Sequence, residues 1–340
     1  MNMRVEATLF VLMAGLLAGC GSGAGTGGYT GSDAGPDQVG AATTLIGVVT
    51  KTDDNPFFIR IREAAITAAN QWRGAKIIAR SGRYDGDNDG QVAAVNDLLA
   101  QRVKGILISP SSSTGIVEVL RKAKAQGVLV IALDSPTTPP DVPDATFATN
   151  NVDAGRKAGS YLRAALGADP ARLAMLDASP GSVLNDQRHE GFLAGFVPKA
   201  GELLESVPTN GDAAKAEQAM TQLLARHPDV NAVYAANEPA AQGAYDALLR
   251  AGATSRVKLA TIDGSCPGVL AVRAGRYAAD VMQFPTAMAT AGVNAVMNFA
   301  TRNTRPASGV RDTGSDVVAA QSLAVSPSRN VDWGLQHCWG

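Results

Sequence analysis

Several residue types are scarce in this 340-residue chain, and each scarcity narrows what the protein can do. The formal net charge is −1, so no basic excess points to nucleic acid or to an anionic membrane surface. The histidines, His189, His227 and His337, lack metal-ligand spacing, and we expect no metal site. After residue 18 no apolar run is long enough to span a membrane. Aromatics make up only 5% of the chain, so any aromatic that the fold would expose carries information.

Motifs for cofactor or catalytic chemistry are absent or out of context. Residues 23–28 spell G-x-G-x-x-G, but no strand precedes them and no helix follows, so a dinucleotide site is not expected. The chain has neither a Walker A loop nor a G-x-S-x-G nucleophile elbow. Asp85 begins an imitation of an EF-hand loop whose twelfth position is Asn96 rather than Glu, which favours a turn followed by a helix cap. We therefore expect neither an enzyme nor a cofactor.

The N-terminus has the features of an export signal. Residues 7–18 form a short apolar run that ends in Leu17-Ala18-Gly19-Cys20. This ending resembles the bacterial lipobox, where the chain is cleaved before a cysteine that is then acylated; an ordinary secretory signal followed by an unrelated cysteine is the alternative. We expect a signal peptide at 1–19, then a lipidated Cys20 and a Gly-rich flexible tether through residue 43. The mature protein would be an extracytoplasmic lipoprotein held at a membrane by its lipid.

Acylation of Cys20 would leave two cysteines in the chain. In an oxidising compartment we expect Cys266 and Cys338 to pair as a disulfide that ties the C-terminal tail to a loop. Two buried free thiols are the alternative.

From residue 45 onward, strand-length apolar segments alternate with helix-length amphipathic segments. The pattern runs from the strand at 45–50 to the one at 128–133, and it restarts near residue 145. Such alternation is typical of parallel sheets that helices cover on both faces. Two similar series predict two α/β lobes. The last long helix, at about 286–300, does not extend the second series, which leaves open a return of the chain to the first lobe.

Polar residues recur where the predicted strands end, and two adjacent phenylalanines accompany them. The carboxyl edge of an open α/β sheet is where ligands bind, so we expect these side chains to converge. Each has an ordinary alternative, because Asn and Asp cap helices, Arg solvates surfaces, and a Phe pair can form a hydrophobic staple. The candidates are Asn55, Phe57, Phe58, Asp134, Arg188, Asn210, Asn237, Glu238, Asp263 and Gln283.

This set of side chains suits a neutral sugar or polyol. Carboxylates accept hydrogen bonds from hydroxyls, Arg donates to them, and amides do both. The C–H face of a sugar can lie on a phenyl ring. A charge-assisted hydrogen bond contributes about 1.5–3 kcal/mol, and a few of them, less ordering costs, reach the roughly 8 kcal/mol of micromolar binding. No general base beside an activated nucleophile is evident, so the site is expected to hold its ligand rather than to transform it.

From about Leu45 onward the chain resembles periplasmic sugar-binding proteins of ABC importers, of the ribose-binding type. The motifs that carry the resemblance are NPFF at 55–58, ALD ending at Asp134, R-x-x-G-F at 188–192, NEPAAQGA from Asn237, IDG from Ile262, and Gln283 after ADVM. The resemblance implies the type I periplasmic binding protein fold, α/β, with two Rossmann-like lobes joined by a three-crossover hinge. It places the N-terminal lobe at 44–149 and 284–317, the C-terminal lobe at 150–283 and 318–340, and crossovers near Thr149–Asn150, Gln283–Phe284 and Asp316–Val318.

The resemblance also implies roles and partners. Phe57 and Phe58 would sandwich the sugar ring, and the polar candidates would bind its hydroxyls. The lobes would close on the ligand by hinge motion, and the closed form would dock on a membrane permease. A sugar-sensing receptor that presents its ligand to a sensor kinase or chemoreceptor is the alternative. We expect a monomer.

Two departures from the ribose-binding pattern bear on the ligand. Ser135 stands where ribose binders have an Arg, and Asn210-Gly211 stands where they have an aromatic. A roomier, more polar pocket would suit a hexose or polyol, with Glu238 as an extra acceptor. Some details look closest to a fructose-binding branch, namely TKTDDNPFF, DGDNDGQVAA, NEPAA, DGSCPG and the terminal Cys-Trp-Gly.

Overall fold

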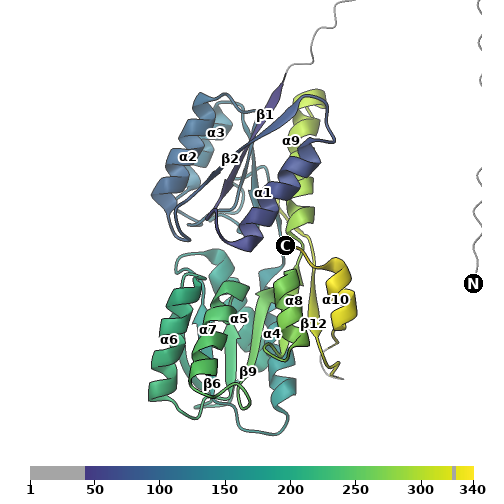
Figure 1. The fold of residues 1–340 in the computed structure, drawn as a ribbon. Coiled ribbons are helices and arrows are strands. Elements are labelled where there is room, and N and C mark those ends of the chain that lie inside the picture. Colours follow the sequence, from purple (N-terminus) through teal and green to yellow (C-terminus); the bar gives the residue numbers. More distant parts are fainter. Residues whose placement is uncertain (1–42, 324–326) are drawn as a thin grey trace, which may run out of the picture. The chain divides into compact units, whose positions relative to one another are not determined.

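The computed structural model describes residues 43–323 and 327–340. The signal peptide, the lipidated Cys20 and nearly all of the tether that the sequence predicts lie outside these residues. Within them the chain forms two six-stranded sheets, and helices cover both faces of each sheet (Figure 1). None of the helices in the described ranges combines the length and the apolar character that a membrane span requires.

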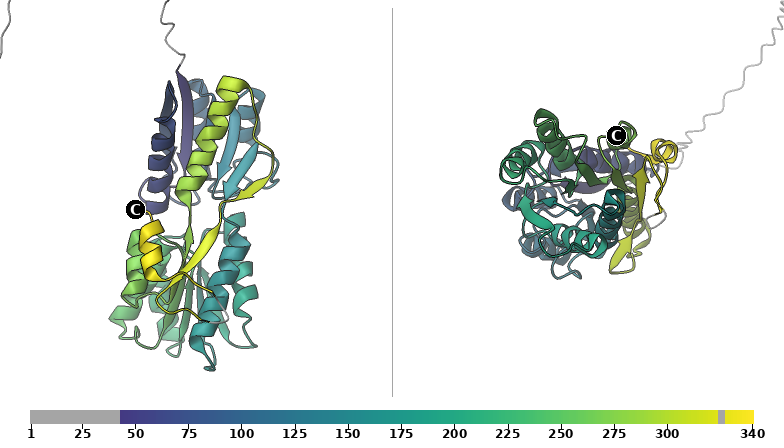
Figure 2. Two further views of the ribbon diagram at one scale, coloured as in Figure 1. Left: turned by 90° about the vertical axis from the view of Figure 1, so that its right-hand side faces the viewer. Right: turned by 90° about the horizontal axis from the view of Figure 1, so that it is seen from below.

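The first sheet has the strand order β11-β5-β4-β3-β1-β2, and all its neighbouring strands run parallel. Its strands are β1 (Thr44–Thr50), β2 (Ala75–Ser81), β3 (Gly105–Ile108), β4 (Leu129–Leu133), β5 (Ala145–Ala148) and β11 (Val310–Asp312). One face packs against α1 (Pro56–Ala69) and α9 (Pro285–Arg302), which lie side by side in Figure 2. The other face packs against α2 (Asn88–Ala100) and α3 (Val117–Ala125).

The second sheet has the order β12-β10-β9-β8-β6-β7 and is parallel except for β12, which runs antiparallel to β10. Its strands are β6 (Leu173–Asp177), β7 (Leu203–Pro208), β8 (Ala232–Ala235), β9 (Lys258–Asp263), β10 (Ala279–Gln283) and β12 (Ser315–Ala319). One face packs against α4 (Asn151–Leu166) and α5 (Val183–Phe196), and the other against α6 (Ala213–Arg226) and α7 (Glu238–Arg250). Two short helices, α8 (Cys266–Arg273) and α10 (Val331–His337), pack together beside β12.

Apart from the late strands β11 and β12, the two sheets repeat one winding, in which the second strand of each series lies outside the first. Five strands inside the sheets are buried along their whole length, since helices cover both faces: β3, β4, β6, β8 and β10. Such strands read as continuous apolar runs rather than as alternating ones. This confirms the two-lobed α/β fold class that the sequence predicts.

The chain passes between the sheets three times, and the third passage corrects a prediction. The passages lie between β5 and α4, between β10 and α9, and between β11 and β12. The third therefore falls at residues 313–314, ahead of the predicted Asp316–Val318, because Asp316 and Val317 already pair with β10. β11 has only three residues, all exposed, so it carries no apolar signal that the sequence could reveal.

Candidate ligand-binding site

All the predicted site residues except Asn210 and Glu238 line one cavity, to which both lobes contribute. The cavity has a volume of about 30 Å³, well below the roughly 300–1,000 Å³ that is typical of open small-molecule sites, so the lobes lie close together over it. Its residues follow the carboxyl ends of the strands in both sheets, the edge at which open α/β sheets bind ligands. The predicted residues in its wall are Asn55, Phe57, Phe58, Asp134, Arg188, Asn237, Asp263 and Gln283.

An aromatic corner forms where β1 leads into α1. Asn55 caps the helix, since its Oδ1 accepts a hydrogen bond of 2.9 Å from the backbone N–H of Phe57. This cap places Phe57 and Phe58 in the first turn, and both are almost fully buried. Their ring centroids lie 5.5 Å apart with the planes at 85°. Because the rings touch edge to face, no sugar fits between them, which corrects the predicted sandwich: a ligand would stack on a ring that the other ring braces.

Asp134 follows β4 in an unusual backbone conformation. Its φ is 65°, in the left-handed region that Asp and Asn enter more readily than most residues. The backbone N–H of Asp134 donates to the carbonyl of Phe147 at 3.0 Å, which fixes this turn to β5. Its Oδ2 accepts a hydrogen bond of 3.0 Å from the Ser135 hydroxyl. Ser135, which stands at the position of the ribose binders' Arg, therefore orients the Asp134 carboxylate.

Arg188 reaches the cavity from α5 and is buried. Its Nε donates to Oδ1 of Asn151 at 2.8 Å, and one Nη donates to the carbonyl of Ala236 at 2.6 Å. A Cβ added at Gly155 on α4 would collide with the Arg188 carbonyl, so only glycine allows the two helices to cross this closely. The crossing and the two hydrogen bonds together fix the guanidinium at the cavity wall.

Asp263, at the end of β9, carries the buried carboxylate of the second lobe. Its Oδ2 accepts from the backbone N–H of Glu238 at 3.0 Å, and its Oδ1 accepts from Nε2 of Gln283 at 2.9 Å. Burial raises the pKa of Asp263, the negative charge of Glu238 raises it further, and the positive charge of Arg188 opposes the shift. Beside it, Asn237 caps α7 by accepting from the N–H of Ala240 at 3.0 Å.

Two predicted site residues lie elsewhere. Asn210 has a φ of 55° and lines a neighbouring pocket with Tyr84 and Lys215. Glu238 points along the start of α8, where it accepts from the backbone N–H groups of Gly264 at 2.9 Å and Ser265 at 2.7 Å and from the Ser265 hydroxyl. Its carboxylate is thus used to fix a loop, which corrects its prediction as an extra sugar acceptor.

Two charged residues that the sequence did not single out also line the cavity. Lys51 is almost fully buried, and its Nζ lies 3.6 Å from Oδ2 of Asp85. Burial raises the pKa of Asp85, against the opposing charge of Lys51. Lys51 follows β1 directly, so the rule of polar residues at strand ends could have found it. The sequence interpretation placed Asp85 only in a turn before a helix cap. In the structure the residue that caps the following helix, α2, is Asp87.

Comparison with known proteins identifies the family to which the chain belongs. Residues 46–304 match the periplasmic binding protein domain family. A ribose import binding protein from Salmonella typhimurium is 32% identical over 254 residues, which cover 74% of this chain and 83% of that one. The chain is a periplasmic binding protein of the ribose-binding type. It is thus a solute-binding component of an ABC transporter that acts outside the cytoplasm, and not an enzyme.

Other relatives of this periplasmic binding protein have different ligands in their names. The D-allose-binding periplasmic protein of Escherichia coli is 28% identical over 259 residues, covering 74% of this chain and 83% of the relative. Among solved structures, an Agrobacterium vitis solute-binding protein with bound D-fucose matches with a TM-score of 0.78 and 22% identity, over 87% of this chain and all of the other. That likeness shows the shared fold.

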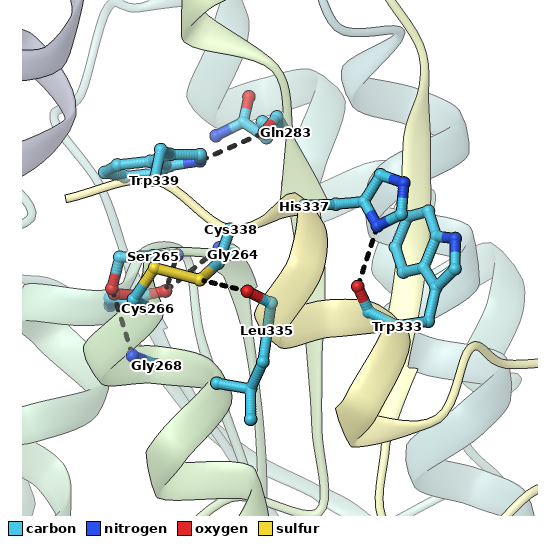
Figure 3. Close-up of a disulfide and its surroundings, with 11 residues drawn as sticks. Gly264, Ser265, Cys266, Gly268, Gln283, Trp333, Leu335, His337, Cys338 and Trp339 are labelled. Carbon is cyan, nitrogen blue, oxygen red and sulfur yellow. Dashed lines mark hydrogen bonds between the residues drawn. A yellow bond between two sulfur atoms is a disulfide. The ribbon is translucent and has the colours of Figure 1, made fainter. Parts of the chain in front are cut away.

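The binding protein also contains a disulfide near its site. Cys266, the first residue of α8, is bonded to Cys338, which follows α10 72 residues later in the chain (Figure 3). The alternative of two free thiols is therefore wrong for this structure. The bond ties the last residues of the chain to the loop that follows Asp263.

Proposed function

We propose that this periplasmic binding protein captures a monosaccharide or polyol outside the cytoplasm, as a monomer, and delivers it to an ABC transporter permease. The cavity carries the proposal, because an aromatic corner from the first lobe faces Arg188 and Asp263 from the second. Aromatic faces suit sugar C–H groups, and fixed charges and amides suit hydroxyls. Ribose and allose binders among the relatives support the same ligand class.

For the ligand itself we favour fructose or a related hexose or polyol. Ser135 in place of an Arg, and Gly211 in place of an aromatic, remove bulk that a pentose site would use. The Lys51–Asp85 pair adds a donor and an acceptor to the cavity wall, which a ligand with more hydroxyls could use. Structural neighbours with bound α-D-tagatopyranose and myo-inositol support six-carbon ligands in this fold.

The test is a ligand screen of the purified mature protein by thermal shift, followed by calorimetry. Fructose, ribose, galactose, glucose, xylose and common alditols are compared. A specific ligand at 100 times its Kd adds about 2.7 kcal/mol to the free energy of unfolding, so we expect a clear rise of Tm with one hexose or alditol. No rise with any of them would contradict the proposal.

A sensory role is the second candidate for the same site. Uptake of the labelled ligand by a deletion strain separates the two: loss of uptake supports delivery to the permease, and normal uptake with a lost response to the sugar supports the receptor. We also propose the lipid anchor at Cys20, on the lipobox-like sequence before it. Labelled palmitate should enter the wild type and not Cys20→Ala.

A further inference from the structure

The chain ends in a short tail that is fastened to the second lobe. Cys338 is joined to Cys266 by the disulfide, and the N–H of Cys266 donates to the carbonyl of Trp339 at 2.8 Å. Trp339 also forms a parallel bridge with Ser265. These contacts fix the tail to the loop between β9 and α8 (Figure 3).

The Trp339 side chain leaves this anchor and packs behind the ligand cavity. It is only 5% exposed, and its ring lies 5.6 Å from the Phe57 ring with the planes at 74°. Its Nε1–H donates to the backbone carbonyl of Gln283 at 3.1 Å, as Figure 3 shows. Phe57 and Gln283 both line the cavity, whereas Trp339 does not. Trp339 therefore supports two cavity residues from outside.

Besides the disulfide and these backbone bonds, the tail is held by partly buried side chains of α10, which pack against α8 and β12. The preceding helix α10 has seven residues, and among them only Gly334 is fully buried. Isolated helices of this length are unstable in water. Cys338 directly precedes Trp339. Without its bond to Cys266, the chain would lose the covalent link that fixes the position of Trp339.

We propose that Trp339 is a positioning residue of the ligand site, and that the Cys266–Cys338 disulfide holds it in place. Trp339 orients the Phe57 ring on which the ligand stacks and fixes the backbone of Gln283, whose side chain donates to Asp263. Because Trp339 is fixed to the second lobe and Phe57 belongs to the first, their contact also joins the two lobes. This inference rests on the proposed sugar-binding function.

The experiment measures the Kd of the best ligand from the screen by calorimetry for four variants. Trp339→Ala and the double variant Cys266→Ser/Cys338→Ser should each bind at least tenfold more weakly than the wild type. Trp339→Phe retains a ring against Phe57 and should bind within about threefold. The control is Trp333→Ala, since Trp333 stacks on His337 outside the site and should leave the Kd unchanged.

Two further measurements separate positioning from a general loss of stability. Dithiothreitol, which reduces the disulfide to two thiols, should weaken binding by the wild type and not by the double Cys variant. In a protein carrying Trp72→Phe and Trp333→Phe, the remaining Trp339 should change its fluorescence when the ligand binds, because its ring touches the cavity wall.

The outcomes distinguish this inference from the function on which it rests. Wild-type affinity in Trp339→Ala or in the double Cys variant would overturn it while the sugar-binding function stands. If the wild type binds none of the sugars, the proposed function fails and the inference falls with it. If Trp339→Ala melts too early for calorimetry, unchanged affinity of the wild type under dithiothreitol would overturn it instead.

Discussion

At the scale of single residues, several polar atoms of the site already form hydrogen bonds within the protein. Arg188 donates hydrogen bonds to Asn151 and to the carbonyl of Ala236. Both oxygens of Asp263 accept hydrogen bonds from N–H groups of the protein. A ligand therefore meets groups whose orientation is set in advance, which lowers the ordering cost of binding. A substitution at Arg188 or Asp263 would therefore disturb the hydrogen bonds within the protein as well as the contact with the ligand.

We predict that Arg188→Lys and Asp263→Asn each weaken sugar binding by at least tenfold. Lys lacks the planar fork of guanidinium donors, and Asn replaces an acceptor oxygen by a donor, so each variant should lose one hydrogen bond to the ligand, a loss of about 1.5–3 kcal/mol. Calorimetry gives the Kd, and a thermal melt shows whether the variants fold. Arg156→Ala, an exposed residue on α4, is the matched control. Wild-type affinity in either site variant would refute the site.

A second residue-scale feature is a pair of carboxylates beside the site. Asp280 is fully buried, and neither of its oxygens has a hydrogen-bond partner among the described residues. A Cβ added at Gly268 would collide with both the Asp280 and the Glu238 carboxylates, so the two groups meet there. Burial, and then the charge of Glu238, hold the pKa of Asp280 well above its ordinary range.

We predict that Asp280→Asn stabilises the protein at neutral pH. A raised folded-state pKa means that the folded chain binds more protons than the unfolded chain, so stability falls as pH rises from the ordinary Asp range, about 4, toward the raised value. Asn avoids this loss and can donate to Glu238. We expect a Tm at least about 2 °C higher at pH 7, with the advantage shrinking toward pH 4. Thermal melts across this range check it, and an advantage that grows toward acid would contradict it.

At the scale of elements, the crossing of α4 and α5 fixes the cationic wall of the site. Gly155 and Gly159 on α4 meet backbone atoms of α5, and Gly191 and Gly195 on α5 meet the backbone of α4. Small residues at a helix crossing allow the backbones to approach closely. Arg188 lies on the approached segment of α5, so the distance between the helices sets how far its guanidinium extends.

We predict that Gly155→Ala lowers both the free energy of unfolding and the sugar affinity. Ala gains about 1 kcal/mol in helix propensity, but overpacking costs about 1–3 kcal/mol and pushes α5 and Arg188 outward. Urea unfolding and calorimetry measure the two effects, with Arg156→Ala on the exposed side of α4 as the control. A variant as stable and as tight as the wild type would show that the crossing adapts.

The sequence predicted the helices and strands better than it predicted the contacts between them. Apolar runs and cap residues gave the strands, the helices and the strand-end residues, because these depend on local patterning. Glu238 was misassigned because its direction depends on α8, a neighbour that is distant in sequence. Lys51 was missed although it directly follows β1, and Asp85 was missed because its partner lies in another loop, which leaves no local pattern. The short, exposed strand β11 has no apolar pattern, so the third passage between the sheets was predicted too far along the chain.

At the scale of the whole molecule, a hydrogen bond crosses between the lobes. Ser182 begins α5 without a side-chain cap of its own. The backbone N–H of Val183 instead donates to Oγ of Ser113, in the loop after β3 of the first lobe, at 3.0 Å. Ser113 and Ser182 are both buried. A helix of one lobe is thus capped by the other, which favours the arrangement in which they meet.

We predict that Ser113→Ala weakens sugar binding by about 3–10-fold, mainly through faster dissociation. A hydrogen bond of this kind is worth about 0.5–1.5 kcal/mol. It forms only when the lobes meet, so its removal should change the Tm without ligand little. Stopped-flow kinetics gives the dissociation rate. Ser112→Ala, whose hydroxyl caps only its own loop, is the control. An unchanged rate would show that the bond does not stabilise the meeting of the lobes.

The disulfide changes how the chain is connected. The second and third passages between the sheets both lie between Cys266 and Cys338, so the 72-residue separation closes them into a covalent ring. A protease that cuts this ring once releases no fragment, because each new end stays attached through the sulfur bridge. The nicked protein should run as one species in non-reducing electrophoresis and as two after reduction. Such a chain can lose a peptide bond at its surface and still keep every segment of both lobes in one molecule.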